Sequence, residues 1–429
     1  MIQQLRNWWG NWDENYKRAV LTLLFSACVV FLAYAIYFVF FKPRPTIEPA
    51  APVALPNLDL PATDIRDILQ KRGIPTEGIE TAPSGTLPLS KLKPDRVAKG
   101  GRTLATPRVY ANTRNADIGV DGSIKYYNAS DGKYYSLDDK GNRLPLSDQV
   151  FKDVQKTTWS PQEASAILEF PDGSNIYYDF AEKKQYTLPR EAIGFKFSDP
   201  GNQIGYKFIT EDPDENWLVV SSPNGDNAIA VEHIGEANPA DVLINWSPDN
   251  TKVAFYRSSS DIDAEEVFLI GQYQENFKSL KVDGRGFEGI WSPQGTRLLY
   301  NVYQPETGYR PELWVTEASD ENLGVNKKNL GVRTWVNKCV FSSSEDVAFC
   351  AVPLYLPQGT GIYPALANTT ADTIYKINTK TSFKQQIAVP TNALGIGLYT
   401  AQKLLLSPDE KTLHMVDVNG GIYDITLEE

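Results

Sequence analysis

The chain is poor in the residues that most often carry out catalysis or bind transition metals. Its 429 residues include two histidines, three cysteines and two methionines. A zinc or iron–sulfur site built from cysteine and histidine therefore has few ligands to draw on. The two histidines, His233 and His414, lie far apart in strand-like runs, so hydrolysis through a histidine base has little to build on. We expect both to be structural or exposed.

Sequence patterns of known catalytic sites are also missing. No G-x-S-x-G, H-E-x-x-H, P-loop, dinucleotide-binding or EF-hand pattern occurs. The acidic stretches 211–216 and 261–266 lack the ligand spacing of a calcium loop. The sequence therefore predicts a protein that is not an enzyme, with no catalytic residue, no cofactor and no metal.

A basic excess is absent as well. There are 42 basic and 53 acidic residues, for a net charge of −11. Because sequence-independent binding to nucleic acid depends on neutralising phosphates, this balance argues against a nucleic-acid partner.

What the chain does contain is a long uncharged run, residues 19–41, between Arg18 and Lys42. As a helix it would span about 35 Å at about 1.5 Å per residue, which exceeds a hydrocarbon core of about 30 Å. A cleaved signal peptide has an apolar region of only about 7–15 residues. We therefore predict a transmembrane helix over 19–41, with Cys28 as a small apolar residue inside it.

The flanks of this run suggest an orientation. Residues 1–18 combine tryptophans with basic residues, as in segments that lie at the membrane interface, and form a short cytoplasmic or interfacial segment. The basic bias places the N-terminus inside. The prediction is a single-pass protein of the cytoplasmic (plasma) membrane whose main domain lies on the extracytoplasmic side.

Three short segments precede that domain. Residues 42–61 are rich in proline and form an extended stalk. Residues 62–73 carry helical spacing of apolar residues with capping signals, so a short helix is expected, packed on its own domain or on a partner. Residues 74–102 return to glycine, proline and serine and are expected to form a flexible linker.

The remainder, residues 103–429, is organised by a repeat. Six segments, among them INWSPDNTKVAFYR and GIWSPQGTRLLYNV, align on one serine and are spaced 38 to 65 residues apart. Each predicts a strand, a tight turn and a second strand, usually followed by two more strands. The aligned serines are Ser160, Ser198, Ser247, Ser292, Ser342 and Ser407.

Four short antiparallel strands at this period are typical of a propeller blade. A weaker seventh unit precedes the six, and the last blade lacks one strand, which residues 103–113 would supply to close the ring. The fold class is therefore all-β, a seven-bladed β-propeller, with six or eight blades as alternatives. The recurring Trp159, Trp246 and Trp291 are expected in its core.

The WSPDN, WSPQG and LSPDE turns resemble the WSPDG-type repeats of the TolB-like propellers, relatives of the WD-repeat propellers. The resemblance covers roughly 330 residues and is specific for the fold rather than for a function. It implies an extracytoplasmic interaction protein. The predicted anchor and proline-rich stalk depart from the family pattern.

Two cysteines lie in one repeat, KCVFSSSEDVAFCAV. If Ser344 and Glu345 form the turn, Cys339 stands directly opposite Cys350, where a disulfide is sterically allowed. The alternative is a pair of buried free thiols. A bridge would support a location outside the cytoplasm.

Three connections between second and third strands are predicted to be the longest: residues 257–266, 303–311 and 352–372. These equivalent connections project from one face of a propeller, and long ordered loops are often functional. Tyrosine and arginine are enriched in binding hot spots, although the same rings also pack loops against their own blade. The predicted partner-binding residues are Tyr303, Tyr309, Arg310, Tyr355, Ile362 and Tyr363.

These observations favour a non-enzymatic, membrane-tethered propeller that binds a protein or cell-envelope partner through its loops. The alternative is a sensor or receptor that binds a small molecule or glycan in the central channel; a ring of convergent polar side chains there would favour it. A third possibility is an accessory subunit of a separately encoded peptidase.

Overall fold

The computed structural model describes residues 93–138 and 140–428, together with eight helical residues between Thr22 and Leu32. The predicted segments 1–18, 42–61 and 62–73 lie outside the described residues, as does most of 19–41. In the parts of the chain that are described, no helix has the length and apolar character needed to span a bilayer. The chain divides into two units after Ser84, and the second is described here by itself.

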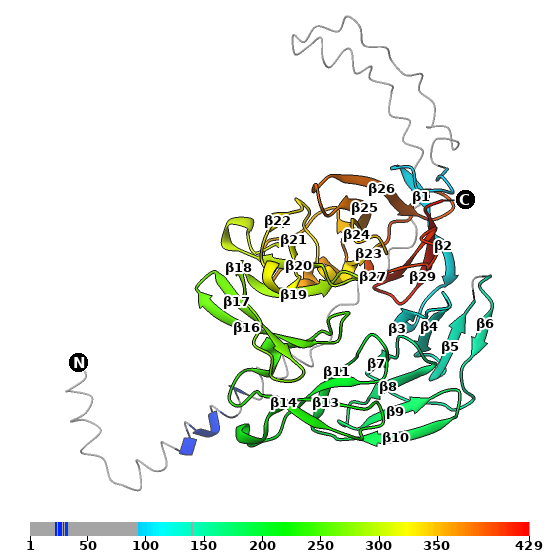
Figure 1. Ribbon diagram of the computed structural model, residues 1–429. Helices are drawn as coiled ribbons and strands as arrows, with labels where there is room; N and C mark the ends of the chain where they lie inside the picture. The colour runs from blue at the N-terminus through cyan, green and yellow to red at the C-terminus, as the bar shows by residue number, and fades with distance from the viewer. Residues whose placement is uncertain are drawn as a thin grey trace, which may run out of the picture. The chain divides into compact units, whose positions relative to one another are not determined.

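This second unit consists of seven sheets arranged as the blades of a propeller (Figure 1); six are antiparallel, and one also contains a parallel strand. The predicted all-β class and the number of seven blades are confirmed. In each blade, the strand that starts the repeat lies nearest the centre. The strand at the opposite edge of the sheet lies outermost. The weak unit that precedes the six serine repeats forms blade 1, as predicted.

The strands of blades 1 to 3 are, in chain order, β3 (Thr113–Ile118), β4 (Ile124–Asn128), β5 (Lys133–Leu137), β6 (Arg143–Pro145); β7 (Lys156–Trp159), β8 (Ser165–Glu169), β9 (Asn175–Asp179), β10 (Lys184–Leu188); and β11 (Ala192–Phe197), β12 (Ile204–Phe208), β13 (Trp217–Ser221), β14 (Ile229–His233). Those of blades 4 and 5 are β15 (Val242–Ile244), β16 (Lys252–Asp261), β17 (Ala264–Gly271), β18 (Leu280–Asp283); and β19 (Arg285–Trp291), β20 (Arg297–Tyr303), β21 (Pro311–Glu317), β22 (Lys328–Asn329).

Blade 6 contains β23 (Cys339–Phe341), β24 (Val347–Pro353), β25 (Asp372–Asn378), β26 (Lys384–Thr391) and, outside them, β1 (Arg102–Leu104). Blade 7 contains β27 (Ala401–Leu406), β28 (Thr412–Asp417), β29 (Ile422–Thr426) and β2 (Thr106–Val109). Short 3-10 helices lie in the connections: η3 (Pro213–Glu215), η4 (Pro239–Asp241), η5 (Pro305–Thr307), η6 (Asp320–Asn322), η7 (Val336–Lys338) and η8 (Pro364–Ala367).

The repeated serine closes the first turn of a blade. The Ser247 hydroxyl oxygen accepts the N–H of Lys252 at 2.9 Å, five residues along the chain. The same contact recurs at Ser198, Ser292 and Ser407. Because the hydroxyl occupies a buried or half-buried turn where the N–H has no strand partner, it satisfies a donor that would otherwise be unpaired.

The repeated tryptophan joins successive blades. Trp159 and Trp246 are buried, as predicted, and their indole N–H groups donate to the backbone carbonyls of Asn115 (2.7 Å) and Lys196 (3.2 Å) in the preceding blades. Trp291 is only half-buried, and its ring stacks on Phe255 of blade 4 with centroids 5.4 Å apart. These side chains therefore fix the packing of one blade on the next.

The ring closes where the two ends of the domain pair. β2 lies antiparallel to β29, so the predicted strand within residues 103–113 completes blade 7. The pairing carries a polar contact chain: the Nε of Arg108 lies 2.5 Å from Asp424, whose other carboxylate oxygen lies 2.7 Å from His414. His414 is therefore a buried structural histidine of blade 7.

The residues that precede β2 also pair with the outer strands of blades 6 and 7. β1 lies parallel to β26, and Val97 forms a bridge to Thr426. The N–H of Gly100 donates to the carbonyl of Ile387 at 2.6 Å. Within the predicted linker 74–102, the described residues from about Asp95 onward do not form a flexible linker, because they pair with the outer edges of blades 6 and 7.

The cysteine prediction is confirmed. Cys339 on β23 lies directly opposite Cys350 on β24, and the two are joined by a disulfide. The bridge is buried and joins the two inner strands of blade 6. Glu345 adopts a positive φ of 60° in the turn between them, as the register requires.

We expect the closure to be sensitive at Ala105, which lies between β1 and β2 and is 1% exposed within the core of blades 6 and 7. Ala105→Asn inserts an amide into this apolar site and should lower the free energy of unfolding by about 2 kcal/mol. Thr106→Asn, at the next and exposed position, should leave it almost unchanged. Urea unfolding measures both, and equal effects would contradict the importance of this contact.

Candidate interaction face

We use the name loop face for the end of the propeller that carries two kinds of connection: those between second and third strands, and those between one blade and the next. Neighbouring strands of a blade run antiparallel, so both kinds of connection emerge at the same end. This is the face on which the sequence places its candidate partner-binding residues.

One of the three predicted loops is not a loop. β16 continues to Asp261 and β17 begins at Ala264, so residues 257–266 form a protruding hairpin with Ile262 at its turn. The sequence indicates the inner parts of both strands, KVAFYR and EVFLIG, but their extension over residues 258–265 is mostly polar and has no apolar alternation. Ile262 is 79% exposed at the tip.

The other two loops are real, and they pair with each other. The connection between β20 and β21 contains η5, and the connection between β24 and β25 runs from residue 354 to residue 371 and contains η8. The N–H of Gly359 donates to the carbonyl of Gly308 at 2.9 Å, and the N–H of Gly361 donates to that of Tyr309 at 2.7 Å. The long loop of blade 6 is thereby held across blade 5.

Arg310 holds this arrangement together. Its Nε donates to the carbonyl of Leu356 at 2.7 Å and its Nη1 to that of Thr307 at 3.0 Å. The side chain is half-buried. Its guanidinium thus bridges two loops of the chain, which is a different use from the partner contact that the sequence suggested.

Tyr303 and Tyr309 also face their own loops. Both are half-buried, and their ring centroids lie 6.4 Å apart. A Cβ on Gly361 would come within 2.6 Å of the Tyr303 side chain, so the loop backbone lies directly on this ring. Burial raises the pKa of Tyr303, which is consistent with that cover.

The remaining three predicted residues point outward. Tyr355 is 66% exposed, Ile362 44% and Tyr363 68%. Leu354 and Leu366 on the same loop are 60% and 51% exposed. Five large apolar side chains therefore stand in solvent on a loop whose backbone is hydrogen-bonded in place.

A second group, which sequence reasoning missed, lies on the connection from blade 6 to blade 7. Leu394, Ile396 and Leu398 are all more than half exposed. The base of this connection is tied to the first loop, because the N–H of Asp372 donates to the carbonyl of Tyr399 at 2.9 Å. The only signal in the sequence is the apolar run ALGIGL, which its glycines make easy to dismiss as a turn. We call these three residues, together with Leu354, Tyr355, Ile362, Tyr363 and Leu366, the apolar clusters.

A buried ion pair lies beneath the junction of the two connections. The Nζ of Lys338 lies 3.0 Å from Asp372, whose carboxylate also accepts the N–H of Ala401 at 2.7 Å. The Asp372 side chain is completely buried. Burial raises the pKa of this carboxyl, and Lys338 and the Ala401 N–H act against that rise.

The opposite half of the loop face differs. In the described residues of blades 1 to 3, the connections between second and third strands carry no exposed large apolar side chain, whereas those of blades 4 and 6 do. The connection between β12 and β13 in blade 3 is instead acidic and half structured by η3. Among the connections between second and third strands, exposed apolar side chains are therefore confined to one side; on the blade-to-blade connections of the other side, Tyr110 and Val150 stand singly in solvent.

The central channel is the other candidate site. Its cavity of about 610 Å³ is lined by the first strands of blades 1, 5, 6 and 7 and by residues that follow the first strands of blades 3 and 4. Asp117 of blade 1 and Lys403 of blade 7 form an ion pair at 3.0 Å, while Ile290 and Val340 line the side of blades 5 and 6. Charged groups thus gather on one side of the channel, and the residues that line it do not form a complete polar ring.

The charges on this side of the channel shift the pKa values of Asp117 and Lys196. Burial acts to raise the pKa of Asp117, but Lys403 outweighs it, and the pKa lies below its usual range. Burial lowers the pKa of Lys196 on β11, and the nearby Lys403 and Lys156 lower it further. Within the described part of the chain, no group of three or more histidine, cysteine or acidic side chains is placed to hold a metal ion.

No protein-family profile matches the sequence, and no curated protein matches it at a significant level. Solved structures match the fold. A chain in the crystal structure of a mitotic checkpoint complex is 12% identical, with 82% of this chain and 97% of that one covered and a TM-score of 0.50. The β-propeller domain of Cps50 (Swd1) from Myceliophteria thermophila is 10% identical over 73% of this chain and 96% of its own, with a TM-score of 0.49.

The tricorn protease is 10% identical over 76% of this chain, which spans only 34% of that protein, with a TM-score of 0.49. At such identities the matches bear on the fold alone. The seven sheets arranged in a ring identify the chain as a β-propeller.

Arg310→Met should release the long loop of blade 6 without unfolding the domain. Because two carbonyl partners lose their donor, we expect amide hydrogen exchange in residues 354–363 to become about tenfold faster, which corresponds to about 1.4 kcal/mol of local opening free energy. The matched change Arg333→Met, at a half-exposed arginine whose 4.0 Å ion pair with Glu312 is weak, should leave this exchange unaltered. Unchanged exchange in the first variant would contradict the bridging role.

Lys338→Met should leave the buried Asp372 carboxylate without its cation. We expect a loss of about 3 kcal/mol in the free energy of unfolding at neutral pH. The folded-state pKa of Asp372 lies above the unfolded value, so the folded state takes up the proton first as pH falls; the loss should therefore shrink as pH is lowered toward the unfolded value.

Adding Asp372→Asn to Lys338→Met removes the uncompensated charge and should restore most of the stability at neutral pH. Urea unfolding at several pH values measures all three proteins. A loss that does not depend on pH, or no recovery in the double variant, would contradict this account.

Proposed function

We propose that this protein is a non-enzymatic, membrane-tethered propeller that binds a protein or cell-envelope partner through its loop face and acts as a scaffold. The observation that carries the proposal is the pair of apolar clusters: eight exposed large apolar side chains on the loop of blade 6 and the connection that follows it. They are presented by backbone that is hydrogen-bonded to neighbouring loops.

Exposed apolar groups gathered on one face are unusual in a protein that acts alone, and they mark sites of association. Tyr355 and Tyr363 are of a residue type that carries much of the energy of protein interfaces. Holding the loops by Arg310 and by loop-to-loop hydrogen bonds reduces the entropy that binding would otherwise cost.

The location is part of the proposal. The uncharged run 19–41 supports a single-pass anchor, and the Cys339–Cys350 disulfide supports an extracytoplasmic propeller, because such bonds persist outside the cytoplasm. The WSPDG-type turns support a relationship to the TolB-like propellers, whose members bind other proteins. The acidic net charge supports a partner other than nucleic acid.

A second function, binding of a small molecule or glycan in the central channel, is favoured by one observation. Lys196 on β11 has no ion-pair partner among the described residues, although it lies close to the channel pair Asp117 and Lys403. A cation in that position suits an anionic ligand.

Site-specific photocrosslinking in cells that produce the full chain tests the loop face. A photoreactive phenylalanine analogue at Tyr355 or Tyr363 should give a discrete crosslinked protein that mass spectrometry identifies. The same analogue at Tyr186, an exposed tyrosine of β10 on the outer edge of blade 2, should not.

The identified protein is then purified for titration. Tyr355→Ser with Tyr363→Ser should weaken its binding at least about tenfold, since each interface tyrosine contributes on the order of 1 to 2 kcal/mol. Tyr186→Ser should have no effect. Equal crosslinking at all three positions would contradict the loop face.

A further inference from the structure

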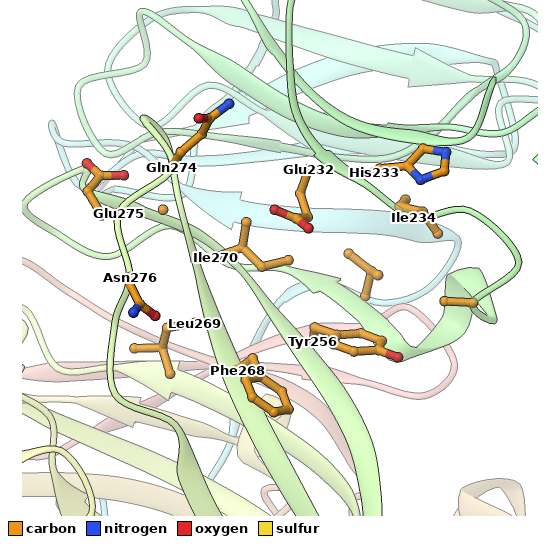
Figure 2. A pocket seen from close by; sticks show the side chains of 13 residues that line it. Glu232, His233, Ile234, Tyr256, Phe268, Leu269, Ile270, Gln274, Glu275 and Asn276 are labelled. Carbon is orange, nitrogen blue, oxygen red and sulfur yellow. The ribbon is translucent and has the colours of Figure 1, made fainter. Parts of the chain in front are cut away.

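A groove lies between the outer part of blade 3 and blade 4 (Figure 2). None of the apolar clusters' residues lines it. It encloses about 530 Å³. One wall comes from β14 and the residues that follow it, and the other from β16, β17 and the connection to β18. Nothing in the proposed function uses this groove.

The groove has an apolar floor. Phe268 of β17 is 41% exposed, and its ring lies 6.2 Å from that of Tyr256 on the paired strand β16. Ile270 of β17 lines the groove on the same side, and Ile234, which follows β14, lines the opposite wall (Figure 2). An occupant with an apolar side chain would therefore cover partly exposed aromatic surface.

The carboxylates that line the groove are not balanced by a lysine or arginine in its lining. They belong to Glu232 and Glu275. Glu275 accepts the N–H of Tyr273 at 2.7 Å, and Glu232 has no hydrogen-bond or ion-pair partner among the described residues. His233 is already engaged, with its ring 4.7 Å from Trp217 and Nε2 3.2 Å from the carbonyl of Asp214. The groove thus complements a cation.

The strand that bounds it has an open edge. β14 pairs with β13 on one side and with no strand on the other. Proteins protect such edges with charged side chains, above all lysine, with proline, with β-bulges or with a covering segment. The other outermost strands described have a lysine, arginine or proline, namely β2, β6, β10, β18 and β22, or are covered, as β26 is by β1. Among them β14, with the sequence IAVEH, has no lysine, arginine or proline and no covering strand; it carries the acidic Glu232 and one bulge at Val231.

The same molecule shows how such an edge is filled. β1 adds a fifth strand to blade 6 by pairing with β26, and the chain around it reaches the neighbouring blade. A segment that paired with β14 in the same way would direct alternate side chains toward blade 4 and into the groove.

We propose that the edge of β14 binds an extended basic peptide segment of a partner protein. The segment adds a fifth strand to blade 3, places an apolar side chain against Phe268 and Tyr256, and places a lysine or arginine beside Glu232 and Glu275. Backbone pairing supplies affinity, and the groove supplies selectivity for alternating apolar and basic residues.

The probe is a fluorescein-labelled hexapeptide, Lys-Phe-Lys-Val-Lys-Phe, titrated against the full chain by fluorescence anisotropy. The matched peptide Glu-Phe-Glu-Val-Glu-Phe should not bind. A version of the basic peptide with alternate backbone amides N-methylated should bind about tenfold more weakly, because it cannot pair with the strand edge. Hydrogen exchange of residues 229–233 should slow only with the unmethylated basic peptide.

Variants locate the contact. Glu232→Lys should weaken binding about tenfold, and Phe268→Ala on the order of fivefold. Glu191→Lys, at an exposed glutamate of blade 3 outside the groove, should leave it unchanged. Equal binding of the N-methylated peptide, of the acidic peptide or of Glu232→Lys would overturn the proposal, as would an absence of binding at millimolar peptide. Each result is independent of the apolar clusters.

Discussion

The pairing of β2 with β29 is the contact on which every other feature of the domain depends. A blade buries its faces against two neighbours, so a row of blades leaves two apolar faces open until its ends meet. Here β2, near the start of the domain, and β29, near its end, belong to the same blade, and the polar contacts from Arg108 through Asp424 to His414 cross that junction. Ring closure therefore joins residues that are more than 300 positions apart in the sequence.

Local chemistry explains why much of this architecture can be predicted. The serine caps a turn within its own repeat unit, and the tryptophan contacts the adjacent, preceding blade. Both contacts are local, so the same two residue types recur in successive repeats. The cysteine register follows from one turn in the same way. The alternation of apolar and polar residues along half-buried strands indicates most of the remaining strands.

The features that sequence reasoning missed are not local, or have no alternation. β1 is three residues long and pairs with a strand almost 290 residues away, so nothing near it predicts a strand. The outer part of the β16–β17 hairpin, residues 258–265, is mostly polar and lacks apolar alternation. At the candidate site, the sequence cannot tell a tyrosine that covers a glycine backbone, such as Tyr303, from one that stands in solvent, such as Tyr363.

The molecule is strongly one-sided. Long connections with apolar surface belong to blades 4, 6 and 7, while the acidic connection of blade 3 and the groove beside it belong to the other half. A rigid ring that carries different chemistry on different blades keeps two binding events at a fixed separation. The fold itself contributes that rigidity, and the loops and edges contribute the selectivity.

The path of the chain into the ring has a mechanical consequence. A tension applied through the residues before Lys93 reaches β1 and the bridges around Val97 first, and it must peel these from blades 6 and 7 before it loads β2. The parallel strand β1 therefore bears the force first and protects the pairing of β2 with β29, which closes blade 7. A propeller held by one end of its chain can give up a few hydrogen bonds under load while its ring stays shut.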